Sequence, residues 1–168
     1  MANVIYEHDS YYHRIQVLEQ GSAPHTERYL HLDSTIEGGM RMRDGGIVLD
    51  YQRFWQLPQM KPGFDLKRAL FIGAGAFGMP ERMSAQYPQA TIDVSEIDPE
   101  VIATGRKFFK LDALPQVTAH AGDARRFLRQ NGDVKYDFIF GDAYNGIRQI
   151  PVHLASKEFF QLVHDRLS

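Results

Sequence analysis

The sequence predicts an α/β protein in which a doubly wound, Rossmann-like parallel sheet follows a small N-terminal β-meander. Two observations support this fold class. Residues 68–167 alternate apolar strand-like runs with helix-like stretches four times, as parallel sheets with right-handed crossovers do. Residues 14–42 instead hold strand-like segments separated only by turns. We therefore expect an N-terminal β-hairpin or meander domain over residues 1–50 and a nucleoside-binding domain over residues 51–168.

The N-terminal part contains three segments of strand character. Apolar and polar residues alternate, most weakly in the last, over residues 14–19, 27–32 and 35–42. Turn-forming residues interrupt the pattern at positions 20–24, 33–34 and 45–46. Residues 50–59 then have the spacing of a short amphipathic helix rich in aromatic side chains, and a Pro- and Gly-containing linker follows it.

Four strand–helix pairs make up the second part. The predicted strands cover residues 69–72, 91–94, 116–119 and 136–140, and the predicted helices 79–87, 99–109, 124–130 and 157–167. Asp98 and Pro99 have the residue types of an N-cap and a first helical position. The fourth strand would form an apolar sheet edge, which is an aggregation hazard, so we expect further chain or another subunit to cover it.

A glycine motif lies directly after the first of these strands. Gly73, Gly75 and Gly78 fit G-x-G-x-x-G, and Glu96 closes the next strand 18 residues after the last glycine. Such glycines let a ligand approach the backbone, and a carboxylate about 20 residues further on accepts hydrogen bonds from ribose hydroxyls. The motif therefore predicts a nucleoside-type site. Asp123 and Asp142 follow the next two strands and would lie at the same edge of the sheet.

Composition excludes several kinds of site. The 168 residues include no cysteine, so disulfides, thiolate metal sites and a cysteine nucleophile are excluded. The seven histidines show no metal-ligand spacing, and we expect no metal. A net charge of −2 gives no reason to expect nucleic-acid binding. We see no signal peptide and no apolar run long enough to span a membrane, and expect a cytoplasmic location with no membrane partner.

Several stretches, in their order along the chain, resemble the polyamine aminopropyltransferases, or spermidine synthases. The resemblance rests on Tyr12-His13-Arg14-Ile15, Leu32-Asp33, Tyr51-Gln52, Glu96-Ile97-Asp98-Pro99-Glu100-Val101-Ile102, Gly122-Asp123-Ala124, Tyr136-Asp137-Phe138-Ile139-Phe140-Gly141-Asp142 and Ser156-Lys157-Glu158-Phe159-Phe160. It implies the fold of S-adenosylmethionine-dependent methyltransferases, a homodimer or a larger oligomer, and no tightly bound cofactor. It also implies decarboxylated S-adenosylmethionine as co-substrate, methylthioadenosine as product and a putrescine-like amine as acceptor.

The resemblance also implies residue roles on the nucleoside side. Glu96 would bind the ribose, Asp123 and Ala124 the adenine, and Gln52 would lie beside the donor. From the residues alone, Asp123 is equally placed to cap a helix, as Asp98 is. These two interpretations stay open at the level of sequence.

On the amine side, the resemblance makes Asp142 the catalytic carboxylate and places Tyr51, Tyr144 and Asn145 around the acceptor. An amine is protonated near pH 7 and attacks a sulfonium carbon only after losing a proton, which a carboxylate can accept or orient. The alternative for Asp142 is a turn residue at a strand end.

Four positions depart from the family pattern. The family's acid in the glycine loop is Ala76 here, and its second acid after the fourth strand is Asn145. His13 replaces a glutamine, and Arg53 replaces an acid after Tyr51-Gln52. The nucleoside half is thus preserved, whereas the amine half has lost negative charge. Three functions follow as alternatives: aminopropyl transfer, non-catalytic nucleoside binding by a scaffold protein, and methyl transfer from intact S-adenosylmethionine. A dinucleotide-dependent oxidoreductase is a weaker fourth, based on the glycine loop alone.

Overall fold

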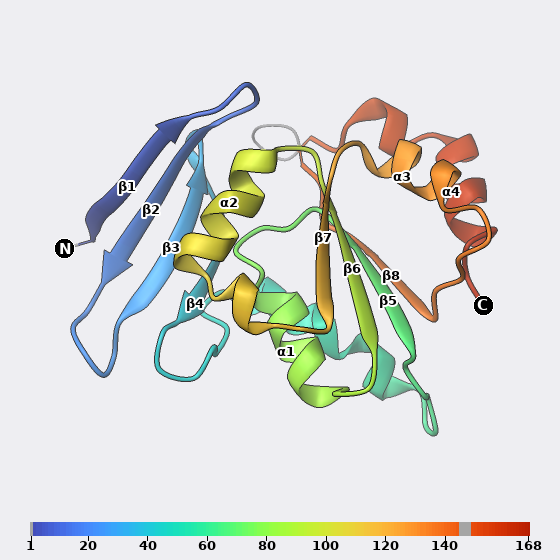
Figure 1. Cartoon of the computed structure of the whole chain (residues 1–168), viewed down its shortest axis with the longest axis horizontal. Helices are drawn as coiled ribbons and strands as arrows, with labels where there is room; N and C mark the ends of the chain where they lie inside the picture. The colour runs from blue at the N-terminus through green and yellow to red at the C-terminus, as the bar shows by residue number, and fades with distance from the viewer. Residues whose placement is uncertain (1, 145–148) are drawn as a thin grey trace.

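The computed structural model describes residues 2–144 and 149–168, and these form two sheets with helices between and beside them (Figure 1). The N-terminal sheet is antiparallel, in the order β1-β2-β3-β4, with strands at Asn3–Asp9, Arg14–Gln20, Glu27–Leu32 and Thr35–Arg41. The second sheet is parallel, in the order β7-β6-β5-β8; β5 to β8 are Arg68–Ile72, Thr91–Glu96, Val117–Ala121 and Phe138–Gly141. The predicted α/β fold class, with its preceding meander, is confirmed.

Strand β1 is an element that the sequence pattern did not reveal. It pairs only with β2, its register shifts between Val4 and Tyr6, and most of its side chains are exposed. An edge strand of this kind buries little apolar surface, so its sequence carries no clear alternation. The inner face of the sheet is formed instead by the later strands, through Ile15, Val17, Leu30 and Met40, which are at most 1% exposed.

The segment predicted as an amphipathic helix after the meander is a 3₁₀ helix, η1 (Asp50–Met60). Pro58 lies inside it and lacks the amide hydrogen that a regular α-helix would need at that point. Gln52 and Trp55 are the large side chains that η1 buries. This turns the helix toward the N-terminal sheet and α1, against which it packs.

Helices cover both faces of the parallel sheet, as a doubly wound fold requires (Figure 1). Their bounds are α1 (Gly78–Gln86), α2 (Pro99–Phe108), α3 (Ala124–Gln130) and α4 (Lys157–His164), with short 3₁₀ turns η2 (Leu111–Ala113) and η3 (Val152–Leu154). On β5, Ala69 and Phe71 belong to the core shared with α1, α2 and the N-terminal sheet, while Leu70 and Ile72 face α3 and α4. One strand therefore belongs to two cores.

Helix α4 ends at His164, three residues before the predicted end, because the chain turns to run beside the start of β8. The Tyr136 amide donates to the Arg166 carbonyl at 2.8 Å, and the Ser168 amide donates to the Tyr136 carbonyl at 2.9 Å. Strand β8 is the last strand of the sheet order, as predicted.

The two sheets meet where β4 touches the loop after β5. A Cβ atom at Gly38 would lie 2.7 Å from the Ala76 amide nitrogen, and one at Gly75 would lie 2.6 Å from the Glu37 carbonyl oxygen. Side chains at Gly38 and Gly75 would separate the two backbones. This close approach holds the end of the N-terminal sheet over the carboxyl ends of the parallel strands, where ligands of such sheets bind.

Candidate active site

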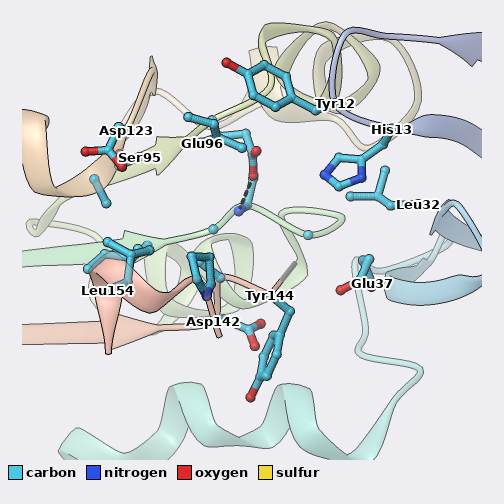
Figure 2. A pocket seen from close by; sticks show the side chains of 18 of the residues that line it. Tyr12, His13, Leu32, Glu37, Ser95, Glu96, Asp123, Asp142, Tyr144 and Leu154 are labelled. Atoms are coloured by element: carbon cyan, nitrogen blue, oxygen red, sulfur yellow. Dashed lines mark hydrogen bonds between the residues drawn. The ribbon is translucent and has the colours of Figure 1, made fainter. Parts of the chain in front are cut away.

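A cavity of about 320 Å³ opens at the carboxyl ends of the parallel strands (Figure 2). The loops after β5, β6, β7 and β8 line one side of it, and residues of the N-terminal sheet line the other. The sequence predicted that the four strand tips would meet here. It did not predict that the β1–β2 and β3–β4 turns would close the cavity from above.

Two of the three motif glycines lie in the cavity wall. Gly73 and Gly75 have φ angles of +94° and +48°, a region that side chains strongly disfavour, and both line the cavity. Gly78 differs from the prediction. It begins α1, and a Cβ atom there would lie 2.5 Å from Nε2 of Gln52, so this glycine permits packing of α1 on η1 and is absent from the cavity lining.

Glu96 is the buried carboxylate of the site, with 7% of its surface exposed. Its Oε2 accepts the Ala74 amide at 2.9 Å and its Oε1 accepts the Asp98 amide at 2.9 Å. Burial raises the pKa of Glu96, and the two amide donors oppose that rise. A carboxylate has about four lone-pair sites, so two are left for a sugar diol in the cavity that Glu96 lines. This geometry fits the predicted ribose role.

Asp123 and Ala124 lie together at the tip of β7 and the start of α3, and both line the cavity. Asp123 is also the N-cap of α3: its Oδ1 accepts the Arg126 amide at 2.8 Å. Its Oδ2 lies 2.7 Å from Nε2 of His153. Both carboxylate oxygens of Asp123 already have partners, so the role that the structure shows for it is the N-cap of α3. An adenine ring would have to share these oxygens or contact Ala124 beside them.

Asp142 lies at the boundary between this cavity and a second one of about 680 Å³. Tyr144 lines both cavities and Tyr51 lines the second, whereas Asn145 lies outside the described residues. Burial, with a further contribution from the charge of Glu37, raises the pKa of Asp142 to about 7. A carboxyl group with that pKa exchanges protons readily near neutral pH.

Glu37 is a site residue that the sequence reasoning missed. It lies on β4, lines both cavities and faces the same space as Asp142 (Figure 2). Its backbone carbonyl accepts the Tyr51 hydroxyl at 2.7 Å, and its Oε1 is within hydrogen-bond reach of the Thr35 hydroxyl. The signal for it was the Gly38-Gly39 pair that follows, because glycines inside a strand mark a close approach of another backbone.

The structure corrects the prediction for Gln52. Its side chain is 2% exposed and absent from the lining of either cavity. Nε2 donates to the Gly39 carbonyl at 3.0 Å, and Oε1 accepts the Val48 and Leu49 amides at 3.2 Å and 3.1 Å. Gln52 therefore joins η1 to β4, and its buried amide does not reach either cavity.

The β1–β2 turn reaches the cavity through Tyr12 and His13. Ser10 holds this turn in place: its hydroxyl lies 2.5 Å from Oδ2 of Asp98, while Oδ1 of Asp98 accepts the Glu100 amide at 2.9 Å. Asp98 is thus the helix cap that its sequence position indicated, and it also anchors the N-terminal sheet. His13 is held by Asp33, with 2.9 Å between Nδ1 and Oδ2.

Two departures noted in the sequence lie outside the cavities. Ala76 is 2% exposed, packed in the core against β4, and does not line either cavity. Arg53 is exposed, pairs with Asp50 at 3.5 Å, and is likewise absent from both linings. Arg53 therefore adds no positive charge to the walls formed by the described residues.

Among residues 2–144 and 149–168, no group of three or more His, Asp or Glu side chains is arranged to hold a metal ion. Helices in this part of the chain all fall short of the length and apolar character that a membrane span needs.

Comparison with known proteins identifies the family. The model of the spermine/spermidine synthase domain matches residues 56–168, which is most of the chain. The chain belongs to the spermine/spermidine synthase family. Its fold agrees: a probable spermidine synthase from Corynebacterium glutamicum superimposes with a TM-score of 0.81 at 20% identity, over 99% of this chain and 61% of that one.

Curated relatives of this chain include polyamine aminopropyltransferases from two bacteria. That of Vibrio vulnificus is 36% identical over 104 residues, covering 61% of this chain and 34% of the relative. That of Corynebacterium efficiens is 31% identical over 173 residues, covering 98% of this chain and 31% of the relative. The chain thus spans about a third of the length of these two relatives.

Proposed function

We propose that this protein transfers an aminopropyl group from decarboxylated S-adenosylmethionine to an amine, as a step of polyamine biosynthesis. The observation that carries the proposal is the position of Asp142, a half-buried carboxyl group at the boundary between the cavity that holds Glu96 and the second cavity. A nucleoside donor in the first cavity and an amine in the second would meet at this carboxyl group.

The donor side of the proposal rests on the first cavity. Glu96 is pre-positioned by two backbone amides, and the glycines at 73 and 75 leave space for a ligand against the backbone. The positive sulfonium would lie toward Glu37 and Asp142, because those carboxylates stand at the end of the cavity away from Asp123 (Figure 2). Methylthioadenosine would remain as the product.

The chemical step balances without a further reactant. The acceptor nitrogen, once deprotonated, uses its lone pair to form a C–N bond to the aminopropyl carbon attached to sulfur. The C–S bond breaks, and its electron pair goes to sulfur, which leaves as a neutral thioether. The proton that the amine loses goes to Asp142 and then to solvent. Since the sulfonium is already a good leaving group, holding the two reactants in line supplies much of the rate.

The experiment that tests this proposal is a parallel calorimetric titration with methylthioadenosine, intact S-adenosylmethionine and decarboxylated S-adenosylmethionine, followed by turnover with primary amines. We expect tight binding of the decarboxylated donor and product formation that Asp142→Asn reduces by about 10²–10⁴-fold, the range of a lost general base. Binding of methylthioadenosine with no turnover of any amine would indicate a non-catalytic nucleoside-binding protein instead.

One observation favours methyl transfer as the second candidate. Position 76 of the glycine loop holds a buried alanine in place of an acid, so the loop itself presents no carboxylate that would repel the carboxylate of intact S-adenosylmethionine. Tighter binding of the intact donor than of the decarboxylated one in the same titration would support this candidate and contradict aminopropyl transfer.

We also propose a homodimer and a cytoplasmic location, both of which rest on the family relationship. Light scattering of the purified chain after size-exclusion chromatography tests the first, and a monomeric mass would contradict it. Fractionation of the source cells tests the second.

A further inference from the structure

We infer that Glu37 selects the donor. Its carboxylate pairs with the terminal ammonium of decarboxylated S-adenosylmethionine and repels the carboxylate that intact S-adenosylmethionine carries beside that ammonium. This inference rests on the proposed function and deepens it, since it names the group that recognises the donor in the same site. It comes from the way the acidic side chains of the first cavity divide between partners within the protein and open space.

Three acidic side chains of the first cavity have partners within the protein on both carboxylate oxygens. Glu96 accepts two backbone amides, and both oxygens of Asp123 are bound in the same way by neighbouring groups. Oδ1 of Asp33 accepts the Arg14 amide at 3.0 Å, and its Oδ2 contacts His13. These three carboxylates are therefore fixed by the hydrogen bonds of the fold, and Glu96 and Asp123 lie at the end of the cavity assigned to the nucleoside.

Glu37 is held less completely. Among the described residues, the Thr35 hydroxyl is the group that its carboxylate bonds. Figure 2 shows this carboxylate pointing into the cavity, toward the side on which Asp142 lies. Burial first, and the charge of Glu37 second, raise the pKa of Asp142, so the two carboxyl groups repel each other in the free protein. A cationic group of a ligand beside Glu37 would relieve this repulsion.

The backbone of Glu37 lies directly against the glycine loop. A Cβ atom at Gly75 would be 2.6 Å from the Glu37 carbonyl oxygen, so the two backbones touch. Gly73 and Gly75 line the same cavity, and a ligand chain that lies on these glycines would end beside the Glu37 carboxylate. The loop itself does not supply this charge, because Ala76 packs against Gly38 and is 2% exposed.

The two donors differ at the position that Glu37 would contact. Both carry a sulfonium and an ammonium group, and intact S-adenosylmethionine has in addition a carboxylate on the carbon that bears the ammonium. Two like charges brought together in a partly enclosed cavity repel, and such repulsion is a common source of specificity. Asp142, with a pKa of about 7, then remains available for the proton of the acceptor amine while Glu37 holds the charge of the donor.

The experiment measures the binding of methylthioadenosine and of both donors to the full chain by calorimetry, with no amine present, for the original protein and for Glu37→Gln. Methylthioadenosine lacks the aminopropyl chain, so its affinity should stay within about twofold, whereas the affinity for the decarboxylated donor should fall about 10–100-fold, as for a lost hydrogen bond between charged groups. The preference for the decarboxylated over the intact donor should shrink by about tenfold or more. Equal losses for methylthioadenosine and the decarboxylated donor, or an unchanged preference, would overturn the inference.

Glu7→Gln is the matched control. It removes the same charge from an exposed position on β1 of the same sheet, outside both cavity linings, and should leave all three affinities within about twofold. Thermal melting without ligand checks Glu37→Gln itself. Its melting temperature at pH 8 should be unchanged or higher, because the variant removes a charge that repels Asp142. A lower melting temperature would mean that Glu37 has a cationic partner within the protein and would overturn the inference.

Turnover with 1,4-diaminobutane is measured separately, so that the two proposals fail in different ways. If Glu37→Gln loses affinity for the decarboxylated donor as expected but the original protein converts no amine, aminopropyl transfer fails and donor selection by Glu37 stands. If the original protein converts the amine and Glu37→Gln raises only the KM for the amine, Glu37 acts on the acceptor. In that case the proposed function stands and the inference is overturned.

Discussion

Asp142 lies between the two cavities in an environment that disfavours its charged form, and this should lower the stability of the ligand-free protein. Burial and the charge of Glu37 raise its pKa in the folded state to about 7, from an ordinary value near 3.8. Below about pH 4 the group is neutral in both states, and above about pH 7 it is charged in both. The destabilisation therefore develops as pH rises from about 4 to 7. In this range Asp142 is ionised in the unfolded state but stays protonated in the folded state.

This predicts that Asp142→Asn stabilises the protein at high pH and not at low pH. At pH 8 we expect the melting temperature to rise by about 2–4 °C, the shift that about 1 kcal/mol produces in a chain of this size. At pH 3, below both pKa values, the variant and the original protein should melt within about 1 °C of each other. Asp133→Asn, an exposed aspartate in the turn after α3, is the control and should show no pH-dependent difference. A less stable Asp142→Asn variant at pH 8 would contradict the environment we describe.

Nucleoside binding by Glu96 can be tested with a variant that replaces one carboxylate oxygen by an NH₂ group. The two oxygens of Glu96 each accept a backbone amide, so Glu96→Gln would place an NH₂ group against one of those donors and remove the charge. We expect methylthioadenosine affinity to fall by about 10–100-fold, as for a lost hydrogen bond to a charged group.

Calorimetry on Glu96→Gln is compared with Glu100→Gln, which changes a half-exposed acid in the first turn of α2, outside the cavity lining. Circular dichroism confirms that both variants fold. If Glu96→Gln bound methylthioadenosine as tightly as Glu100→Gln, Glu96 would be a structural link between the glycine loop and β6 only.

The positions of individual candidate residues were predictable where they lie at the end of a strand. Glu96 ends β6, Asp142 follows β8 directly and Asp123 lies two residues after β7, so topology alone brings them to one edge of the sheet. Gln52 was wrongly placed because the phase of a 3₁₀ helix, which sequence spacing does not fix, turns its amide toward β4. His153 was missed because its contact with Asp123 joins residues 30 positions apart through a loop.

At the scale of elements, the packing of α2 against the loop that precedes α1 depends on one glycine. A Cβ atom at Gly105 in α2 would lie 2.3 Å from Cε2 of Phe77, a fully buried ring at the start of α1. Phe77 itself has a left-handed backbone, with φ +58°, so the loop cannot easily shift it away. The Phe77 ring therefore leaves no space for a side chain at position 105, and this explains a glycine inside a helix, where glycine is unfavourable.

Gly105→Ala distinguishes this packing from helix propensity by its sign. Propensity alone predicts a gain of about 1 kcal/mol, whereas overpacking predicts a loss of about 1–3 kcal/mol in the free energy of unfolding. We expect the loss, measured by urea denaturation. Gly105→Ala is also combined with Phe77→Leu. The losses in the free energy of unfolding of the two single variants should add up to more than the loss of the double variant, because the smaller side chain at position 77 leaves space for the new methyl group. Strict additivity would contradict the contact.

Most elements were predictable because their signals are local. Asp98-Pro99 fixes the start of α2, and the apolar run of β5 reflects burial on both faces. No local signal marks the end of α4. The chain leaves the helix after His164 and pairs with Tyr136, about 30 residues earlier in the sequence. Strand β1 carried too little apolar character to be seen.

At the scale of the whole molecule, the two sheets share one core. A single cluster of buried side chains runs from Ile15 and Met40 in the N-terminal sheet to Phe71 and Ile92 in the parallel sheet. The second cluster, around Leu70 and Phe159, begins on the other face of the same strand β5. The division of the chain at residue 50 was drawn from sequence pattern, and this packing links the two parts instead of isolating them.

The shared core predicts that the protein unfolds in one cooperative transition. Trp55, the only tryptophan, is 5% exposed and lies in that core on η1, so its fluorescence reports on the contact between the N-terminal sheet and the rest. Far-ultraviolet circular dichroism reports mainly on α1 to α4, which cover the parallel sheet. In a two-state transition the curves from the two probes coincide in urea, with one midpoint and one slope. A tryptophan transition at lower urea than the circular dichroism change would mean that residues 1–50 separate first. The candidate active site, which β4 and the β1–β2 turn help to line, would then be lost before the parallel sheet unfolds.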